Sequence, residues 1–77
     1  MSWNYRIVTR DAGASYGIHE VYYHGDGTFR AWSEEPIAPF GENPVELKCE
    51  LEYMMRAFEK PYLEEISGVL HEVAGTP

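Results

Sequence analysis

The hydrophobic pattern of the chain changes its period at Asn43, and this change divides the sequence into two kinds of structure. Asn43 is a favoured helix N-cap, Pro44 suits the first helical position, and Glu46 follows the cap by three residues. Apolar residues then recur every three or four positions, as on one face of an amphipathic helix. They are Leu47, Leu51, Met54 and Phe58. The sequence therefore predicts a helix that begins at Pro44, ends before Pro61 and covers a sheet with this stripe.

The residues before this boundary follow the two-residue period of β-strands. Three segments rich in aromatic and β-branched residues span 3–9, 16–24 and 28–33. Turn-forming residues separate the first two segments, and Asp26-Gly27, a strong hairpin signal, separates the second from the third. Strands joined by such short turns favour an antiparallel meander.

The length of 77 residues allows one domain. We predict a single α+β domain over residues 1–77, in which a three-stranded antiparallel β-meander is followed by one amphipathic helix and the core spans about 3–60. In the C-terminal segment, 61–77, apolar residues again repeat at helical spacing and predict a second, short helix. They are Leu63, Ile66, Leu70 and Val73. Gly68 within this segment and the lack of a preceding N-cap both weaken that helix.

Charge and cysteine content restrict the partners and the compartment. Thirteen acidic residues against six basic ones give a net charge of −7, which disfavours nucleic acids and anionic membranes as partners. An acidic surface suits a basic protein partner, or serves solubility alone. Cys49 is the one cysteine, whereas small secreted domains usually carry several. With no apolar signal segment and no apolar run near the ~18 residues of a membrane span, we expect a cytoplasmic protein.

His19, Glu20 and His24 are the residues that most resemble a metal or acid–base site. In a regular strand His19 and Glu20 point to opposite faces, and His24 lies roughly 13 Å from Glu20. One metal ion cannot bridge that span, because its ligands lie about 2 Å from it. We therefore expect no catalytic residues, metal or cofactor, and keep a small metal-binding or enzymatic protein that uses these residues as an alternative. Cys49, without an activating base, is expected to pack beside the apolar stripe of the helix.

Aromatic residues occupy both faces of the predicted strands. A single helix covers one face of a small sheet, and Tyr22, Tyr23 and Trp32 cannot all lie beneath it in regular strands. The second face needs a cover, which either the C-terminal segment or another subunit could supply. These three residues are our candidate protein interface, with a homodimer or another protein as the expected partner.

Several strings of residues carry a resemblance. They are Trp3-Asn4-Tyr5-Arg6, Gly17-Ile18-His19-Glu20-Val21-Tyr22-Tyr23, Ala31-Trp32-Ser33-Glu34 with Pro36, Ala38, Pro39 and Gly41, and Leu47, Leu51, Met54 and Lys60-Pro61. Together they resemble a family of small uncharacterised bacterial proteins over about residues 3–63. More distantly, the order strand–strand–strand–loop–helix is similar in topology to the N-terminal domain of HicB-like antitoxins.

The HicB-like resemblance implies dimerisation and binding of a small basic RNase toxin. Such antitoxins normally add a C-terminal DNA-binding segment, but no Lys or Arg follows Lys60 in this chain. DNA binding is therefore not expected. The sequence favours a non-enzymatic protein-interaction module, dimeric or bound to a partner. The alternative from the resemblance is a HicB-like antitoxin or a degenerate relative.

Overall fold

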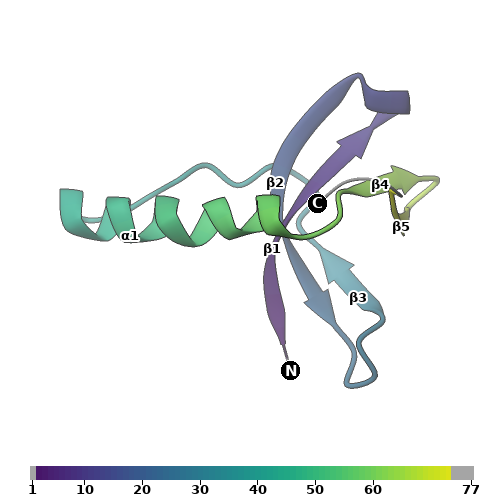
Figure 1. Cartoon of the computed structure of the whole chain (residues 1–77), viewed down its shortest axis with the longest axis horizontal. Coiled ribbons are helices and arrows are strands. Elements are labelled where there is room, and N and C mark those ends of the chain that lie inside the picture. The colour runs from purple at the N-terminus through teal and green to yellow at the C-terminus, as the bar shows by residue number, and fades with distance from the viewer. Residues whose placement is uncertain (1, 74–77) are drawn as a thin grey trace.

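The computed structural model describes residues 2–73 and shows an α+β domain with a five-stranded mixed sheet and one long helix (Figure 1). Strands β1 (Trp3–Arg10), β2 (Ser15–Tyr23) and β3 (Phe29–Trp32) pair in antiparallel fashion, β1 with β2 and β2 with β3. The predicted meander is therefore present. It forms three of the five strands, so the prediction of a three-stranded sheet is only partly right.

Short turns join the strands of the meander. A single turn of 3₁₀ helix, η1 (Asp11–Gly13), links β1 to β2. Between β2 and β3, the N–H of His24 donates to the carbonyl of Thr28 at 2.8 Å, and the Asp26 carboxylate accepts from the backbone and hydroxyl of Thr28. The hairpin predicted from Asp26-Gly27 is thus confirmed.

The C-terminal segment forms a β-hairpin, and the prediction of a short helix there is wrong over the residues that the structure describes. Strands β4 (Leu63–Ile66) and β5 (Val69–Glu72) extend the sheet in the order β3-β2-β1-β4-β5. Ser67 and Gly68 form the turn between them with φ of 52° and 79°, a left-handed conformation that glycine adopts without strain. β4 runs parallel to β1, which places β1 at the centre of the sheet. Residues 74–77 of the predicted helical segment lie outside the described residues.

Helix α1 (Pro44–Met55) begins where the sequence predicts and continues as a 3₁₀ helix, η2 (Arg56–Glu59). The Asn43 side chain caps it, since its Oδ1 accepts the backbone N–H of Glu46 at 2.9 Å. The Glu46 carboxylate accepts the N–H of Glu42 at 3.3 Å, one residue before the N–H that a standard capping box uses.

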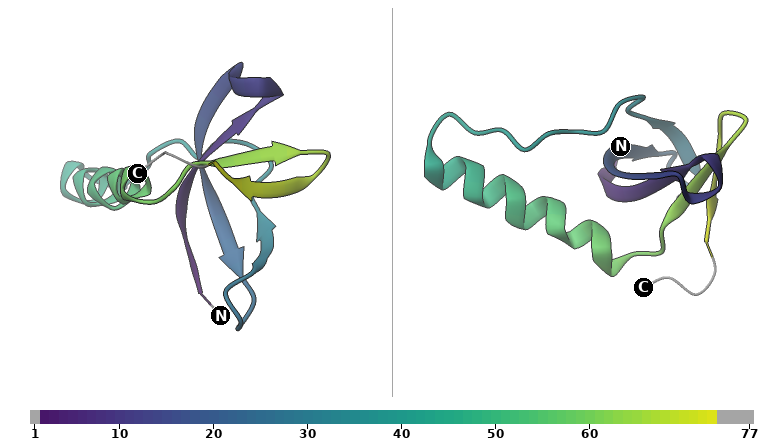
Figure 2. Two further views of the ribbon diagram at one scale, coloured as in Figure 1. Left: turned by 45° about the vertical axis from the view of Figure 1, so that its right-hand side comes forward. Right: turned by 90° about the horizontal axis from the view of Figure 1, so that it is seen from above.

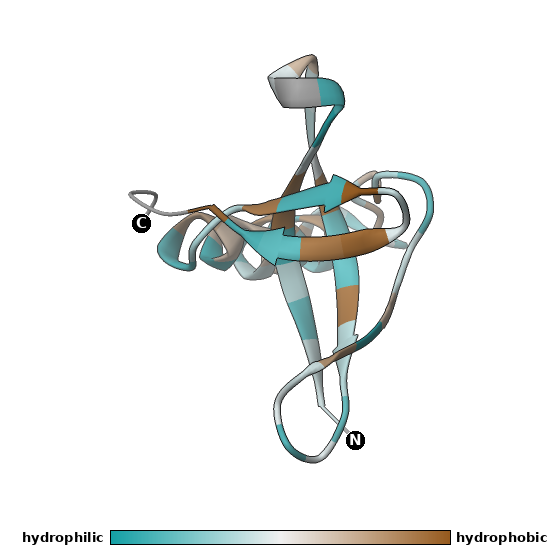
Figure 3. Ribbon diagram, turned by 90° about the vertical axis from the view of Figure 1, so that its right-hand side faces the viewer, coloured by the Kyte–Doolittle hydropathy of each residue, from teal (hydrophilic) through white to brown (hydrophobic). Residues whose placement is uncertain are grey.

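Two buried clusters lie on opposite faces of the sheet. On the helix face, Tyr5 and Ile7 of β1 pack against Met54 and Ala57 of the helical segment. On the other face, the C-terminal hairpin curls across the meander, as Figure 3 shows. This second cluster contains Val8, Val21, Leu63 and Leu70. The C-terminal segment, one of the two predicted covers, therefore packs on the second face as strands.

Most of the predicted core stripe of the helix is not buried. Met54 is buried, whereas Leu47, Leu51 and Phe58 are 37%, 45% and 45% exposed, so the predicted role of these three as the main cover of the sheet is wrong. Figure 2 shows the reason: α1 extends away from the sheet, and only its C-terminal end and η2 lie against β1. Ala57, which the stripe did not include, is fully buried there instead.

Candidate functional site

Helix α1, its continuation η2 and the loop that leads to the helix, residues 37–43, form a projection that we call the arm (Figure 2). The loop approaches the helix closely at Gly41. A Cβ atom at this position would lie 2.4 Å from the backbone nitrogen of Leu47. At the other end of the loop, the Ile37 N–H donates to the Ile18 carbonyl at 2.8 Å. Both ends of the loop are therefore tied, one to β2 and one to the helix.

Replacing Gly41 with alanine is expected to lower the free energy of unfolding by about 1–3 kcal/mol, because the added methyl meets backbone atoms that cannot move aside independently. Gly25 is the matched control, since a Cβ there has no atom within 4 Å. Chemical denaturation of both variants tests this. Equal stability for Gly41→Ala and Gly25→Ala would mean that the loop does not pack on the helix in solution.

Along one side of the arm, large apolar side chains face solvent. We call this side the flank. Leu47, Leu51, Met55 and Phe58 share it by helical spacing, Tyr16 lies beside Phe58 at its base, and Phe40 lies near its tip between Pro39 and Gly41 of the loop, which contact the helix. Phe40 is 75% exposed, Tyr16 63% and Met55 62%. Taking about 200 Å² for a whole large side chain, the flank exposes on the order of 600 Å². That lies at the upper end for the largest apolar patch of a monomer, roughly 300–600 Å².

Two shallow cavities follow the flank. The first, about 210 Å³, lies between the loop and the helix, with Pro39 on one side and Leu51 and Met55 on the other. The second, about 240 Å³, lies at the base of the arm between Phe58 and Tyr16. Ile18 lines both, so the two apolar cavities are neighbours, and together we call them the groove. Each is smaller than the ~300–1,000 Å³ of typical small-molecule pockets, so inserted side chains are the better fit.

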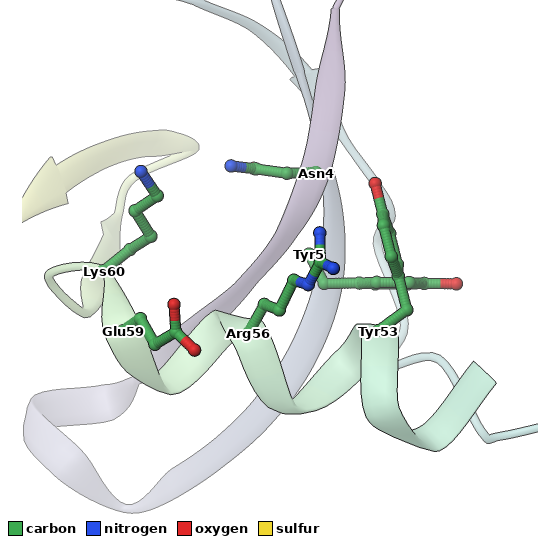
Figure 4. Close-up of a pocket in the computed structure, with 6 residues that line it drawn as sticks. All are labelled: Asn4, Tyr5, Tyr53, Arg56, Glu59 and Lys60. Carbon is green, nitrogen blue, oxygen red and sulfur yellow. The ribbon is translucent and has the colours of Figure 1, made fainter. Parts of the chain in front are cut away.

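The opposite side of the helix carries a polar cavity of about 330 Å³ (Figure 4). Arg56 stacks over the ring of Tyr53 at 5.5 Å, and Glu59, Lys60 and Asn4 complete the rim. The Tyr5 hydroxyl at its wall donates to the Glu50 carboxylate, and burial together with that carboxylate raises the pKa of Tyr5 above its usual value. Tyr5 therefore stays protonated at neutral pH and is not available as a general base.

The three residues of the predicted interface lie on two different faces. Tyr22 is half-buried beside Trp3 on the helix face, with ring centroids 6.2 Å apart, and its hydroxyl donates to Glu20 at 2.6 Å. Tyr23 and Trp32 are half-buried against the second cluster, on the face that the hairpin covers. The structure does not bring them together into one patch. Their role in an interface stays a prediction, while the most exposed large aromatic and aliphatic side chains lie on the arm.

The sequence-predicted alternative site is dispersed in the structure. His19 is buried, with Nδ1 2.8 Å from the Ser33 carbonyl oxygen, Glu20 accepts from Tyr22, and His24 is exposed at the hairpin turn. Within residues 2–73, no group of three or more His, Cys, Asp or Glu side chains is placed to hold a metal ion. Each of the three residues thus has a separate structural environment.

Cys49 is exposed, so the expectation that it packs beside the apolar stripe is wrong. It lies on the helix side away from the flank, by an open cavity that it shares with Glu52 and Arg56. The two sides of α1 thus differ in chemistry. This difference makes Cys49 a useful reference position for experiments on the flank.

Comparison with known proteins shows no relative: no protein-family model matches the chain, and no curated protein or solved structure matches it. The resemblances drawn from the sequence therefore stay predictions. In the part of the chain that the structure describes, no helix is both long and apolar enough to cross a membrane.

Proposed function

We propose that the chain is a non-enzymatic protein-interaction module that binds its partner through the groove along the arm. The observation that carries this proposal is the uncovered apolar flank of the arm. At roughly 25 cal/mol per Å², about 600 Å² of apolar surface corresponds to a gross gain on the order of 15 kcal/mol when a partner covers it. Much of that gain offsets the entropy lost on association, but a substantial driving force for binding is left.

The surroundings of the flank also suit a protein interface. Interfaces combine an apolar centre with a polar rim. Here Leu51 and Met55 lie at the centre, while the exposed Lys48 borders the flank by helical spacing. The groove offers indentations for side chains, and the close loop–helix contact at Gly41 holds its outer wall.

Site-specific photo-cross-linking in the cells that make the protein tests the proposal. A benzophenone amino acid replaces Met55 in the groove or, as the matched control, Cys49 on the other side of the same helix. We expect discrete adducts from position 55 and not from position 49. No adduct from position 55, or equal labelling from both positions, would contradict the proposal.

A HicB-like antitoxin, or a degenerate relative, is the second candidate. Two observations support it: the order β1-β2-β3-loop-α1 agrees with the topology that the resemblance implies, and the net charge of −7 suits a small basic toxin. Screening by salt weakens binding between oppositely charged proteins. An adduct with a small basic protein whose complex dissociates at high salt would support this candidate; an adduct with an acidic or neutral protein would contradict it.

A further inference from the structure

We infer that the occupant of the groove is a second copy of this chain, with the two arms packed antiparallel about a two-fold axis. This inference rests on the proposed function and names its partner. In a two-fold interface the same surface serves on both copies, so the surface must be complementary to itself. The shape of the arm meets this condition.

The tip of the arm is complementary in shape to its base. Phe40 and Leu47 project near the tip of the arm, whereas the cavity of about 240 Å³ beside Phe58 and Tyr16 lies at its base. Antiparallel packing brings the tip of each arm to the base of the other. The exposed side chains of one tip then meet the cavity of the opposite base, twice by symmetry.

The lining of the groove favours a second copy over a basic protein. A groove that binds a basic protein is expected to have carboxylates among its lining residues. Both cavities are instead lined by apolar side chains, a glycine and tyrosines. Two flanks of about 600 Å² bury on the order of 1,200 Å², the lower limit for stable specific interfaces. We therefore expect a dimer with a dissociation constant in the micromolar range.

Salt dependence follows from the net charge. Each copy carries −7, so the copies repel one another at long range, and salt screens this repulsion. Raising the salt from about 0.05 to 0.5 M is expected to leave the dimer intact or to tighten it. Dissociation of the self-complex over that range would contradict an apolar interface between like-charged copies.

Sedimentation equilibrium tests the interface directly. We expect the wild-type mass to approach twice 8.8 kDa at tens of micromolar. Met55→Glu and Leu51→Glu each place two carboxylates in the contact and are expected to weaken it by at least about 100-fold. Val69→Glu is the matched control, because Val69 is 52% exposed on the C-terminal hairpin. A wild-type mass of 8.8 kDa at every concentration, or a Met55→Glu protein that dimerises normally, would overturn the inference.

Disulfide cross-linking tests the antiparallel arrangement. In a Cys49→Ala background, Leu47→Cys near the tip of one copy is expected to form a disulfide with Phe58→Cys at the base of the other when the two variants are mixed. Disulfides within each variant alone, with none between the two variants, would overturn the arrangement.

These experiments distinguish failure of the second-copy inference from failure of the interaction-module proposal. A monomeric wild type whose position 55 cross-links to a different protein would overturn the second-copy inference and support the interaction module. A monomeric wild type without any adduct at position 55 would contradict both. Adducts at twice the chain mass of 8.8 kDa, absent in the Leu51→Glu background, would support both.

Discussion

Replacing Leu63 with alanine is expected to lower the free energy of unfolding by about 2–5 kcal/mol. Leu63 is fully buried, and it packs with Val8, Val21 and Leu70 between the meander and the C-terminal hairpin. Truncation leaves a cavity between elements that cannot easily close it. In so small a domain this is a large part of the total stability. Urea denaturation followed by circular dichroism measures the effect.

Leu51→Ala provides the informative contrast. Leu51 is 45% exposed on the arm, so the same truncation is expected to cost less than about 1 kcal/mol in the monomer. Ile66→Ala, at a half-exposed position of the hairpin, controls for truncation near the turn. If Leu51→Ala were the more damaging change at protein concentrations below dimerisation, the helix stripe would be core and the flank would not be a free surface.

Arg6→Ala is expected to destabilise the domain by about 2–4 kcal/mol, because the Arg6 side chain is buried and ties three segments together. Its guanidinium donates to the Tyr23 hydroxyl at 2.9 Å and to the Pro61 carbonyl at 2.7 Å. It also forms an ion pair with Glu72 of β5 at 3.4 Å. Its removal leaves the Pro61 carbonyl without this donor and the hairpin without one of its ties to β1.

Two variants separate the contributions of Arg6. Arg30→Ala removes an exposed guanidinium stacked on Tyr22 and is expected to change the stability by no more than about 0.5 kcal/mol. Arg6→Met keeps an apolar stem and removes the donors. A loss for Arg6→Met equal to that for Arg6→Ala would assign the effect to the hydrogen bonds. A loss for Arg6→Ala as small as that for Arg30→Ala would mean that Arg6 does not join these segments.

Elements encoded by local chemistry could be predicted from the sequence. Asn43 defines the helix start because its side chain accepts the free backbone N–H of Glu46. Pro44 favours the same start because its fixed φ already suits the first helical position. Asp26 and Gly27 define the hairpin turn. The Asp26 carboxylate accepts a hydrogen bond from the Thr28 N–H, and Gly27 adopts a positive φ. These signals act within a few residues, so no tertiary context is needed to interpret them.

The C-terminal hairpin depends on a distant partner and was therefore predicted wrongly. The spacing of Leu63, Ile66 and Leu70 fits a helix, but Leu63 and Leu70 are buried because β1 accepts β4 as a second neighbour. A signal for this was present in β1. Ile7 and Val8 are adjacent apolar residues that are buried on opposite faces, as in a central strand. Ser67-Gly68 also reads as a two-residue hairpin turn when strands are considered on either side.

The candidate site could be recognised only in part. Periodicity indicates which helix residues are apolar, but it does not indicate whether the covering surface belongs to the same chain. Leu51 and Met54 differ by three positions, and the structure exposes the first and buries the second. The direction in which α1 leaves the sheet decides this. The loop before α1 is hydrogen-bonded to the sheet at Ile37 and contacts the helix at Gly41, and both contacts join residues that no local sequence pattern pairs.

The parallel pairing of β1 with β4 has a consequence for the order in which the domain can form. Because β1 lies at the centre and its second neighbour follows only after α1, the second face of the meander has no cover while the chain is being synthesised up to about residue 62. Val8 and Val21 are then open to solvent or to a chaperone. Folding is thus completed by closure of a loop of more than fifty residues between Val8 and Leu63, a slow step relative to formation of the local hairpins.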